Sequence, residues 1–141
     1  MIIEQLRSAT GEALSDINKL LKQLRDEGGN GVLSELEAVV NNDNTALIVA
    51  KDGERIVGIG TLYTIQKISK RSGHVEDVVV DDAYRGQGLG EKLMQFLLDV
   101  ARKKHIKKVY LTTRPARIAA NKLYQKLGFQ RKETNVYSIE L

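Results

Sequence analysis

The stretch Asp82-Ala-Tyr-Arg-Gly-Gln-Gly-Leu-Gly-Glu91 places three of the chain's 12 glycines within five positions, just after the apolar run Val78-Val79-Val80. A strand that ends at Val80, a tight turn and a helix that begins near Leu89 bring unpaired backbone N–H groups and the positive end of a helix dipole to one spot. Glycines at 86, 88 and 90 let the backbone come within hydrogen-bond distance of a ligand, and Arg85 adds a positive charge beside them. The stretch therefore predicts a site for a phosphate or pyrophosphate.

Two common phosphate loops do not fit this spacing. The pattern Gly86-x-Gly88-x-Gly90 misses the dinucleotide fingerprint G-x-G-x-x-G by one residue, and the Gly-Lys-Ser/Thr of a Walker A loop is missing. Neither a dinucleotide nor a nucleoside triphosphate is favoured. For the G-x-G-x-G fragment taken alone, a turn that merely caps a helix remains the alternative.

Length and composition predict one self-sufficient domain over residues 1–141. A chain of 141 residues buries about two thirds of its unfolded surface on folding. It contains no cysteine, so disulfides and thiolate metal sites are excluded and a reducing, cytoplasmic location is expected. No basic region precedes a long apolar core, and no apolar run approaches ~18 residues, so we expect neither export nor a membrane span.

The net charge of +4 is concentrated in residues 102–108 and 122–132. Nucleic acid is one possible partner for such stretches. However, only 5% of the residues are aromatic and no RNA-binding aromatic signature occurs. We expect a solvated or anion-attracting basic rim and no nucleic-acid partner.

Hydrophobic periodicity predicts about four helices and six to seven strands. The expected helices cover about residues 10–27, 33–40, 89–101 and 115–127. The expected strands cover the N-terminus, 46–50, 55–65, 74–80, 109–113 and one or two segments within 129–141. This order predicts an α/β (α+β) fold with a mixed, largely antiparallel sheet, in which strands 74–80 and 109–113 flank the one strand–helix–strand crossover and run parallel.

Tyr84-Arg-Gly-Gln-Gly-Leu-Gly90 resembles the acyl-CoA pyrophosphate loop, Arg/Gln-x-x-Gly-x-Gly/Ala, of the GNAT superfamily of N-acetyltransferases. The strands His74–Asp81 and Lys108–Thr113 support the resemblance. So does Ala119–Phe129, which resembles that family's helix ending in Leu-Tyr-x-Lys-x-Gly-Phe. Residues 74–129 carry the match and are expected to bind acetyl-CoA. Residues 1–73 match only in the order of their elements and are expected to form the acceptor side.

The resemblance implies acetyl-CoA as co-substrate, without a metal. The pantetheine arm of acetyl-CoA would lie in a V-shaped gap between strands 74–80 and 109–113. The amides of the arm would pair with the backbone of Val78, Val79 and Val80. Asn121 is expected to hold the same arm. The pyrophosphate would be bound by backbone N–H groups of Arg85, Gly86, Gln87, Gly88, Leu89, Gly90 and Glu91.

Direct acetyl transfer to an amine needs an uncharged nucleophile and a proton for the departing thiolate. Tyr124 lies at the helical tyrosine position of the family and is expected to supply that proton; an ordinary amphipathic core residue is the alternative. Asn121 precedes it by three residues on the same helix face. Many relatives have an asparagine near position 117, where this chain has Arg117, and this departure leaves the role of Asn121 less defined.

Glu76 and Asp77 precede the valines, close to the expected acetyl group. Strand alternation sends adjacent side chains to opposite faces, so we expect only one of them, Glu76, to line the acceptor pocket and act as base. The stretch from residue 74 to 90 is also similar to that of glucosamine-6-phosphate N-acetyltransferases, in which a glutamate at this place lies in the active site. Alternatives are a surface ion pair of Glu76 and a water-mediated base.

The residues and the resemblance together predict an acetyl-CoA-dependent N-acetyltransferase whose acceptor is a primary amine. A small-molecule amine is favoured over a protein, because no accessory domain is evident. The alternative is an acyl-CoA-binding regulatory module without turnover. A homodimer is possible, with the C-terminal strand region as its contact.

Overall fold

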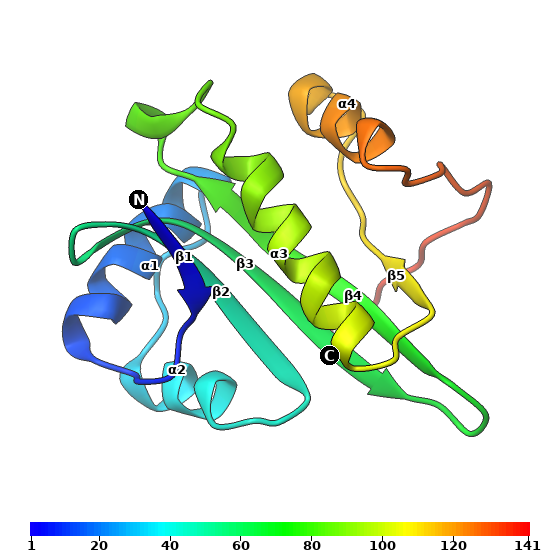
Figure 1. The fold of residues 1–141 in the computed structure, drawn as a ribbon, viewed down its shortest axis with the longest axis horizontal. Coiled ribbons are helices and arrows are strands. Elements are labelled where there is room, and N and C mark those ends of the chain that lie inside the picture. The colour runs from blue at the N-terminus through cyan, green and yellow to red at the C-terminus, as the bar shows by residue number, and fades with distance from the viewer. The chain divides into compact units, whose positions relative to one another are not determined.

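The computed structural model describes every residue from Met1 to Leu141 (Figure 1). Contacts divide the chain into two compact units, Met1–Leu111 and Thr112–Leu141. The first contains β1 (Ile2–Gln5), α1 (Gly11–Leu24), α2 (Leu33–Val40), β2 (Thr45–Asp52), β3 (Arg55–Gln66), β4 (Arg71–Val80), the 3₁₀ turn η1 (Asp82–Tyr84), α3 (Leu89–Lys103) and β5 (Lys108–Tyr110). The second contains α4 (Ile118–Lys126).

One mixed sheet of five strands, in the order β1-β2-β3-β4-β5, forms the centre of the first unit. Strands β1 to β4 pair antiparallel, and β5 runs parallel to β4. The predicted mixed sheet, parallel pair and number of helices are confirmed. The predicted strand count of six to seven is wrong, because the sheet has five strands.

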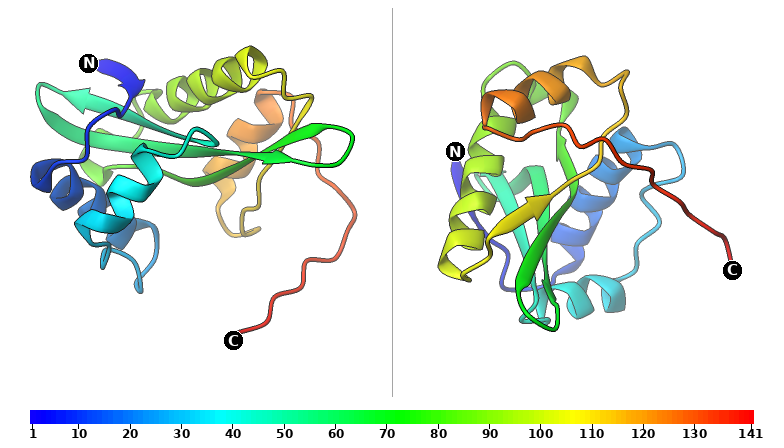
Figure 2. Two further views of the ribbon diagram at one scale, coloured as in Figure 1. Left: turned by 90° about the horizontal axis from the view of Figure 1, so that it is seen from below. Right: turned by 90° about the vertical axis from the view of Figure 1, so that its right-hand side faces the viewer.

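Helices cover both faces of this sheet. Figure 2 shows α1 and α2 on one face and α3 on the other. Ile17 and Leu20 of α1 are buried in the first layer, while Leu93 and Leu97 of α3 are fully buried in the second. An added Cβ on Gly60 of β3 would lie 2.8 Å from Leu97 Cδ1, so α3 rests directly on the backbone of the sheet.

The first helix starts and stops for local reasons. Thr10 is the N-cap, and its hydroxyl accepts a hydrogen bond from the N–H of Ala13 at 3.1 Å. The helix ends at Leu24, three residues before the predicted limit, because Arg25 has an extended backbone. A Cβ on Gly28 would lie 2.3 Å from the carbonyl oxygen of Leu21, so the chain passes close to the finished helix at this point.

In the second unit, α4 begins at Ile118 instead of at the predicted Pro115. The N–H of Arg117 bonds to the carbonyl of Arg114 at 3.0 Å, which closes a turn with Pro115 at its second position. Proline favours that position because its fixed φ matches the turn. The helix stops as expected before Gly128, whose φ is +97°.

The strands predicted within 129–141 are wrong, since this segment contains no strand. Apolar β-formers alone do not make a strand, which needs a hydrogen-bonded partner. Phe129 at the start of the segment is half-buried, and the other large apolar side chains are exposed, namely Val136, Tyr137, Ile139 and Leu141. A homodimer contact through this segment stays a prediction.

The predicted strand 109–113 is reduced to Lys108–Tyr110, because the ladder with β4 joins only Ser72–His74 to Lys108–Tyr110. Beyond His74, β4 continues to Val80 without β5 beside it. None of the helices has the length and apolar character that crossing a membrane requires.

Candidate functional site

The glycine turn between β4 and α3 is an open, amide-lined corner. Gly86 and Gly88 have φ values of +78° and +79°, a region that side-chain-bearing residues rarely adopt. A Cβ added at either position would meet no atom within 4 Å, so the protein itself leaves the space beside them empty. Gly88 is the N-cap of α3 and, as a glycine, has no side chain that could cap the first amides of the helix. The corner therefore meets the requirements for binding an anion.

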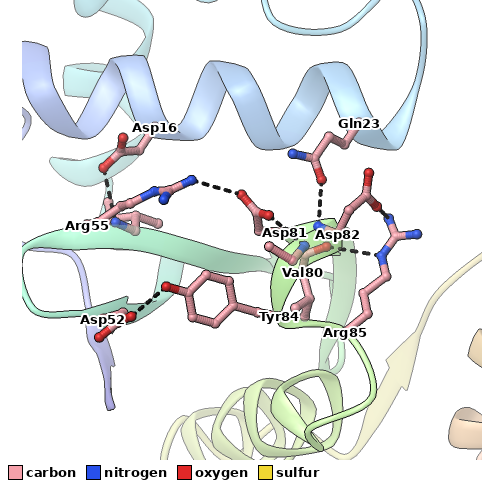
Figure 3. Close-up of polar contacts among 11 residues, drawn as sticks. Asp16, Gln23, Asp52, Arg55, Val80, Asp81, Asp82, Tyr84 and Arg85 are labelled. Atoms are coloured by element: carbon pink, nitrogen blue, oxygen red, sulfur yellow. Dashed lines mark hydrogen bonds and ion pairs between the residues drawn. The ribbon is translucent and has the colours of Figure 1, made fainter.

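Buried Asp81 fixes the entry to this corner (Figure 3). Its Oδ1 accepts a hydrogen bond from the N–H of Ala83 at 2.9 Å, and its Oδ2 accepts one from Arg55 of β3 at 3.3 Å. The next residue, Asp82, donates its N–H to Oε1 of Gln23 on α1 at 3.0 Å. The turn is thus tied to both the sheet and the first helix.

Arg85 and Tyr84 also fold back onto the protein. The guanidinium of Arg85 lies 2.8 Å from the Asp82 carboxylate and donates from Nε to the carbonyl of Val80 at 3.3 Å. Tyr84 donates its hydroxyl to Asp52 at the end of β2, and this bond raises the pKa of the phenol. The positive charge predicted beside the glycines is present, directed at the end of β4.

A β-bulge at Asp77 interrupts β4. Asp77 has a φ of +54°, and the register with β3 shifts between Ile59, which faces Val79, and Thr61, which faces Glu76. Aspartate tolerates this left-handed conformation better than most residues. Side chains no longer alternate strictly across the bulge.

An open pocket of about 680 Å³ lies beside the bulge. The end of α1, the turn between α2 and β2, and strands β3 and β4 supply its walls, which include Arg25, Asn42, Asn44, Tyr63, Glu76 and Asp77. The expectation that only one of the two carboxylates would line the pocket is wrong. Both line it, because the bulge turns Asp77 to the same side as Glu76.

The charges in the pocket are partly compensated. Arg25 is the only lysine or arginine in its wall, and its guanidinium forms an ion pair with Asp77. Glu76 is exposed and forms no ion pair, so the surface ion pair considered for it does not occur. Burial raises the pKa of the Tyr63 phenol, and the negative charges of Asp77 and Glu76 raise it further. Tyr63 therefore stays protonated at neutral pH.

In the second unit, Tyr124 packs edge to face against Phe129, with ring centroids 5.9 Å apart. Burial raises the pKa of the Tyr124 phenol, while the charge of Arg117 opposes the shift. The Asn121 amide donates to the carbonyls of Arg114 and Arg117 at 3.1 and 2.8 Å, so it stabilises the start of α4. Its Oδ1 forms no hydrogen bond within the chain.

The structure thus brings together Glu76, Asp77 and Tyr63, and it places Val78–Val80 and the glycine turn in direct continuation along the chain. Sequence reasoning missed Arg25, Asn42 and Asn44 as pocket residues. Arg25 has the sequence context of a solvated cation at a helix end, and the asparagines that of a polar loop. No short motif distinguishes them, because only the packing of α1 and α2 on the sheet brings them to the pocket.

Residues 18–129 match the family model described as Acetyltransferase (GNAT) family. The chain belongs to this family. It is 40% identical over 82 residues to a glucosamine 6-phosphate N-acetyltransferase of Trypanosoma brucei brucei, which covers 56% of this chain and 54% of that protein. It is 37% identical over 82 residues to the N-alpha-acetyltransferase RimI of Mycobacterium tuberculosis, which covers 58% of this chain and 50% of that protein.

A solved structure of a Trypanosoma brucei acetyltransferase superimposes with a TM-score of 0.80 at 28% identity, covering 99% of each chain. The chain spans about half the length of these two curated relatives. The match in fold confirms the α/β architecture implied by the resemblance of the glycine turn.

Proposed function

We propose that this chain transfers the acetyl group of acetyl-CoA to a primary amine of a small molecule. The observation that carries the proposal is the pocket beside the bulge, where the unpaired carboxylate of Glu76 lies a few residues along the same strand from the glycine turn. Membership of the acetyltransferase family supports the reaction. The glucosamine 6-phosphate N-acetyltransferase relative supports a small amine as the acceptor.

The residues present fit acetyl-CoA. Beyond His74, β4 has no β5 neighbour, so the backbone of Val78, Val79 and Val80 is proposed to pair with the amides of the pantetheine arm in a splayed gap between the two strands. Gly86 and Gly88 leave open space next to backbone donors, which suits a pyrophosphate. We assign its binding to the N–H groups of residues 85–91. Asn121 is proposed to hold the arm through Oδ1, which forms no hydrogen bond in the chain.

The proposed chemistry is direct. The amine nitrogen attacks the thioester carbonyl, a C–N bond forms, and the C–S bond breaks. Glu76, directly or through a water molecule, takes the proton of the amine. Tyr124 gives its proton to the departing sulfur, and its raised pKa keeps that proton in place at neutral pH. An acceptor that binds as an ammonium first loses one proton to water. For the uncharged amine the proton count then balances, because one proton is accepted on the amine side and one is donated on the thiol side.

A protein N-terminus is the second candidate acceptor, and the RimI relative favours it. An assay of CoA release with glucosamine 6-phosphate, glucosamine and a short peptide with an unblocked N-terminus separates the two acceptors. Turnover with an amino sugar that drops at least about 100-fold in Glu76→Gln supports the proposal. Turnover confined to the peptide assigns the second candidate. Acetyl-CoA binding without turnover on any of these amines favours the regulatory module.

A further inference from the structure

The only arginine or lysine in the wall of the pocket beside the bulge already forms an ion pair with a carboxylate of the same pocket. We propose that Arg25 is a specificity-determining residue that binds an anionic group, a phosphate or a carboxylate, carried by the acceptor amine. The inference rests on the proposed function, because it concerns the acceptor of that reaction. It assigns to the acceptor two charged groups, an ammonium and an anion.

The position of Arg25 is fixed, whereas its ion pair is exchangeable. Arg25 directly follows α1, and the Gln23 side chain two residues earlier bonds to the turn at Asp82. The Arg25 side chain is 47% exposed and that of Asp77 28%. Half-exposed pairs of this kind gain little net free energy, so an anion that reaches the guanidinium can replace the carboxylate. The planar guanidinium also offers paired donors that match a phosphate or a carboxylate.

Asp77 does not depend on Arg25 for its direction. The bulge sets the backbone of Asp77 and keeps its carboxylate in the pocket next to that of Glu76. When an anion takes Arg25, the Asp77 carboxylate becomes available to the acceptor's ammonium. An acceptor with both charges therefore satisfies both members of the pair.

Other amines bind less well for the same electrostatic reason. An acceptor with a second positive charge in place of the anion is repelled by the guanidinium of Arg25. A neutral hydroxylated amine leaves the Arg25–Asp77 pair in place and can use Glu76 alone. The pocket thus ranks anion-bearing amines above analogues that lack the anionic group.

The first test compares kcat/KM for glucosamine 6-phosphate, glucosaminic acid and glucosamine in wild type, Arg25→Ala and Lys22→Ala. Lys22 is the matched control, since it lies one turn earlier on α1, and its ammonium bonds to the Asp26 carbonyl outside the pocket wall. We expect Arg25→Ala to lower the preference for the anion-bearing amine over glucosamine about tenfold, the loss of one charged hydrogen-bonded contact. Lys22→Ala should leave the preference unchanged. If Arg25→Ala lowers the preference for glucosamine 6-phosphate, the bound anion is a phosphate. If it lowers the preference for glucosaminic acid, the bound anion is a carboxylate.

The second test needs no turnover. Calorimetry measures the binding of glucose 6-phosphate and gluconate, which carry the anions without an amine. Arg25→Ala should weaken binding of one of them about tenfold. Asp77→Asn should strengthen it, because asparagine tolerates the left-handed backbone and releases the guanidinium.

The inference is overturned if Arg25→Ala and Lys22→Ala show the same kcat/KM preference and the same affinity for the anions. It is also overturned if wild type prefers glucosamine to both glucosamine 6-phosphate and glucosaminic acid. If wild type acetylates none of the amines, the proposed function fails. In that case the calorimetry still decides the role of Arg25.

Discussion

Gln23 of α1 accepts a hydrogen bond from the backbone N–H of Asp82, 3.0 Å away, at the start of the glycine turn. Two residues later, Arg25 forms the ion pair with Asp77 in the pocket beside the bulge. The last turn of α1 therefore contacts both the corner proposed for the pyrophosphate and the pocket proposed for the amine. A change in this helix end is expected to affect the binding of both substrates.

Gln23→Ala removes the link between α1 and the turn. Because the Asp82 N–H is exposed, water replaces the lost acceptor, and the free energy of unfolding should fall by less than about 1 kcal/mol. The turn becomes less ordered, so the KM for acetyl-CoA should rise severalfold with little change in kcat. Lys19→Ala, at an exposed position one turn earlier, is the control for helix propensity. A KM equal to that of Lys19→Ala would contradict the anchoring role.

Gly88→Ala tests the open corner. The backbone φ of +79° should lower the free energy of unfolding by about 1 kcal/mol, and the new methyl group enters space that the chain leaves open. We expect the Kd for CoA, measured by calorimetry, to rise about tenfold or more. Gly53→Ala, with a φ of +60° and equally open space in the β2–β3 turn, should show the loss of stability without the loss of binding. Equal Kd values for the two variants would exclude the corner as the pyrophosphate site.

Tyr124→Phe keeps the ring that packs on Phe129 and removes the proton donor. The melting temperature should therefore change little, while kcat should fall about 100-fold, the usual size of a general-acid contribution. Tyr137→Phe, at an exposed position in the C-terminal segment, is the control. Unchanged turnover in the Tyr124 variant would remove this residue from the mechanism.

Tyr63 gives the pocket a spectroscopic signature. Its pKa is raised by burial and by the charges of Asp77 and Glu76, so its tyrosinate band should appear above pH of about 10, as the difference between the alkaline titrations of wild type and Tyr63→Phe. The folded chain holds this proton more tightly than the unfolded chain. The contribution to stability is therefore present below about pH 10 and is lost as the pH rises through the folded pKa.

The same titration in an Asp77→Asn background should move the Tyr63 pKa downward, because one of the two nearby negative charges is gone. A Tyr63 pKa that stays in place after this substitution would mean that Asp77 does not act on the phenol.

The elements that sequence could predict are those whose determinants are local. The stripe Leu89, Leu93, Leu97 and the glycines before it specify a helix with an open N-terminus, and both occur as expected. The bulge at Asp77 could not be predicted, because it results from the register with β3 and not from the local pattern. The prediction of strands within residues 129–141 is wrong for a related reason. Their β-type residues depend on a pairing partner that local sequence does not specify.

The pocket shows the same limit. Glu76 can be found from the sequence because it lies just before the valines of β4, whereas 50 positions separate Arg25 from Glu76 along the chain and no local pattern links the two. Tertiary packing alone brings the two to one wall.

The contact between α3 and the sheet, here called the seam, limits which positions of this protein can be altered. Because Gly60 lies under Leu97, a larger residue at position 60 would lift the helix and move the corner proposed for the pyrophosphate of the carrier molecule. The pocket wall at Asn42 and Asn44 belongs to a separate surface turn without such a constraint. Directed evolution toward new amines should therefore diversify that turn and leave the seam untouched, so that the acetyl donor is kept while the recipient changes.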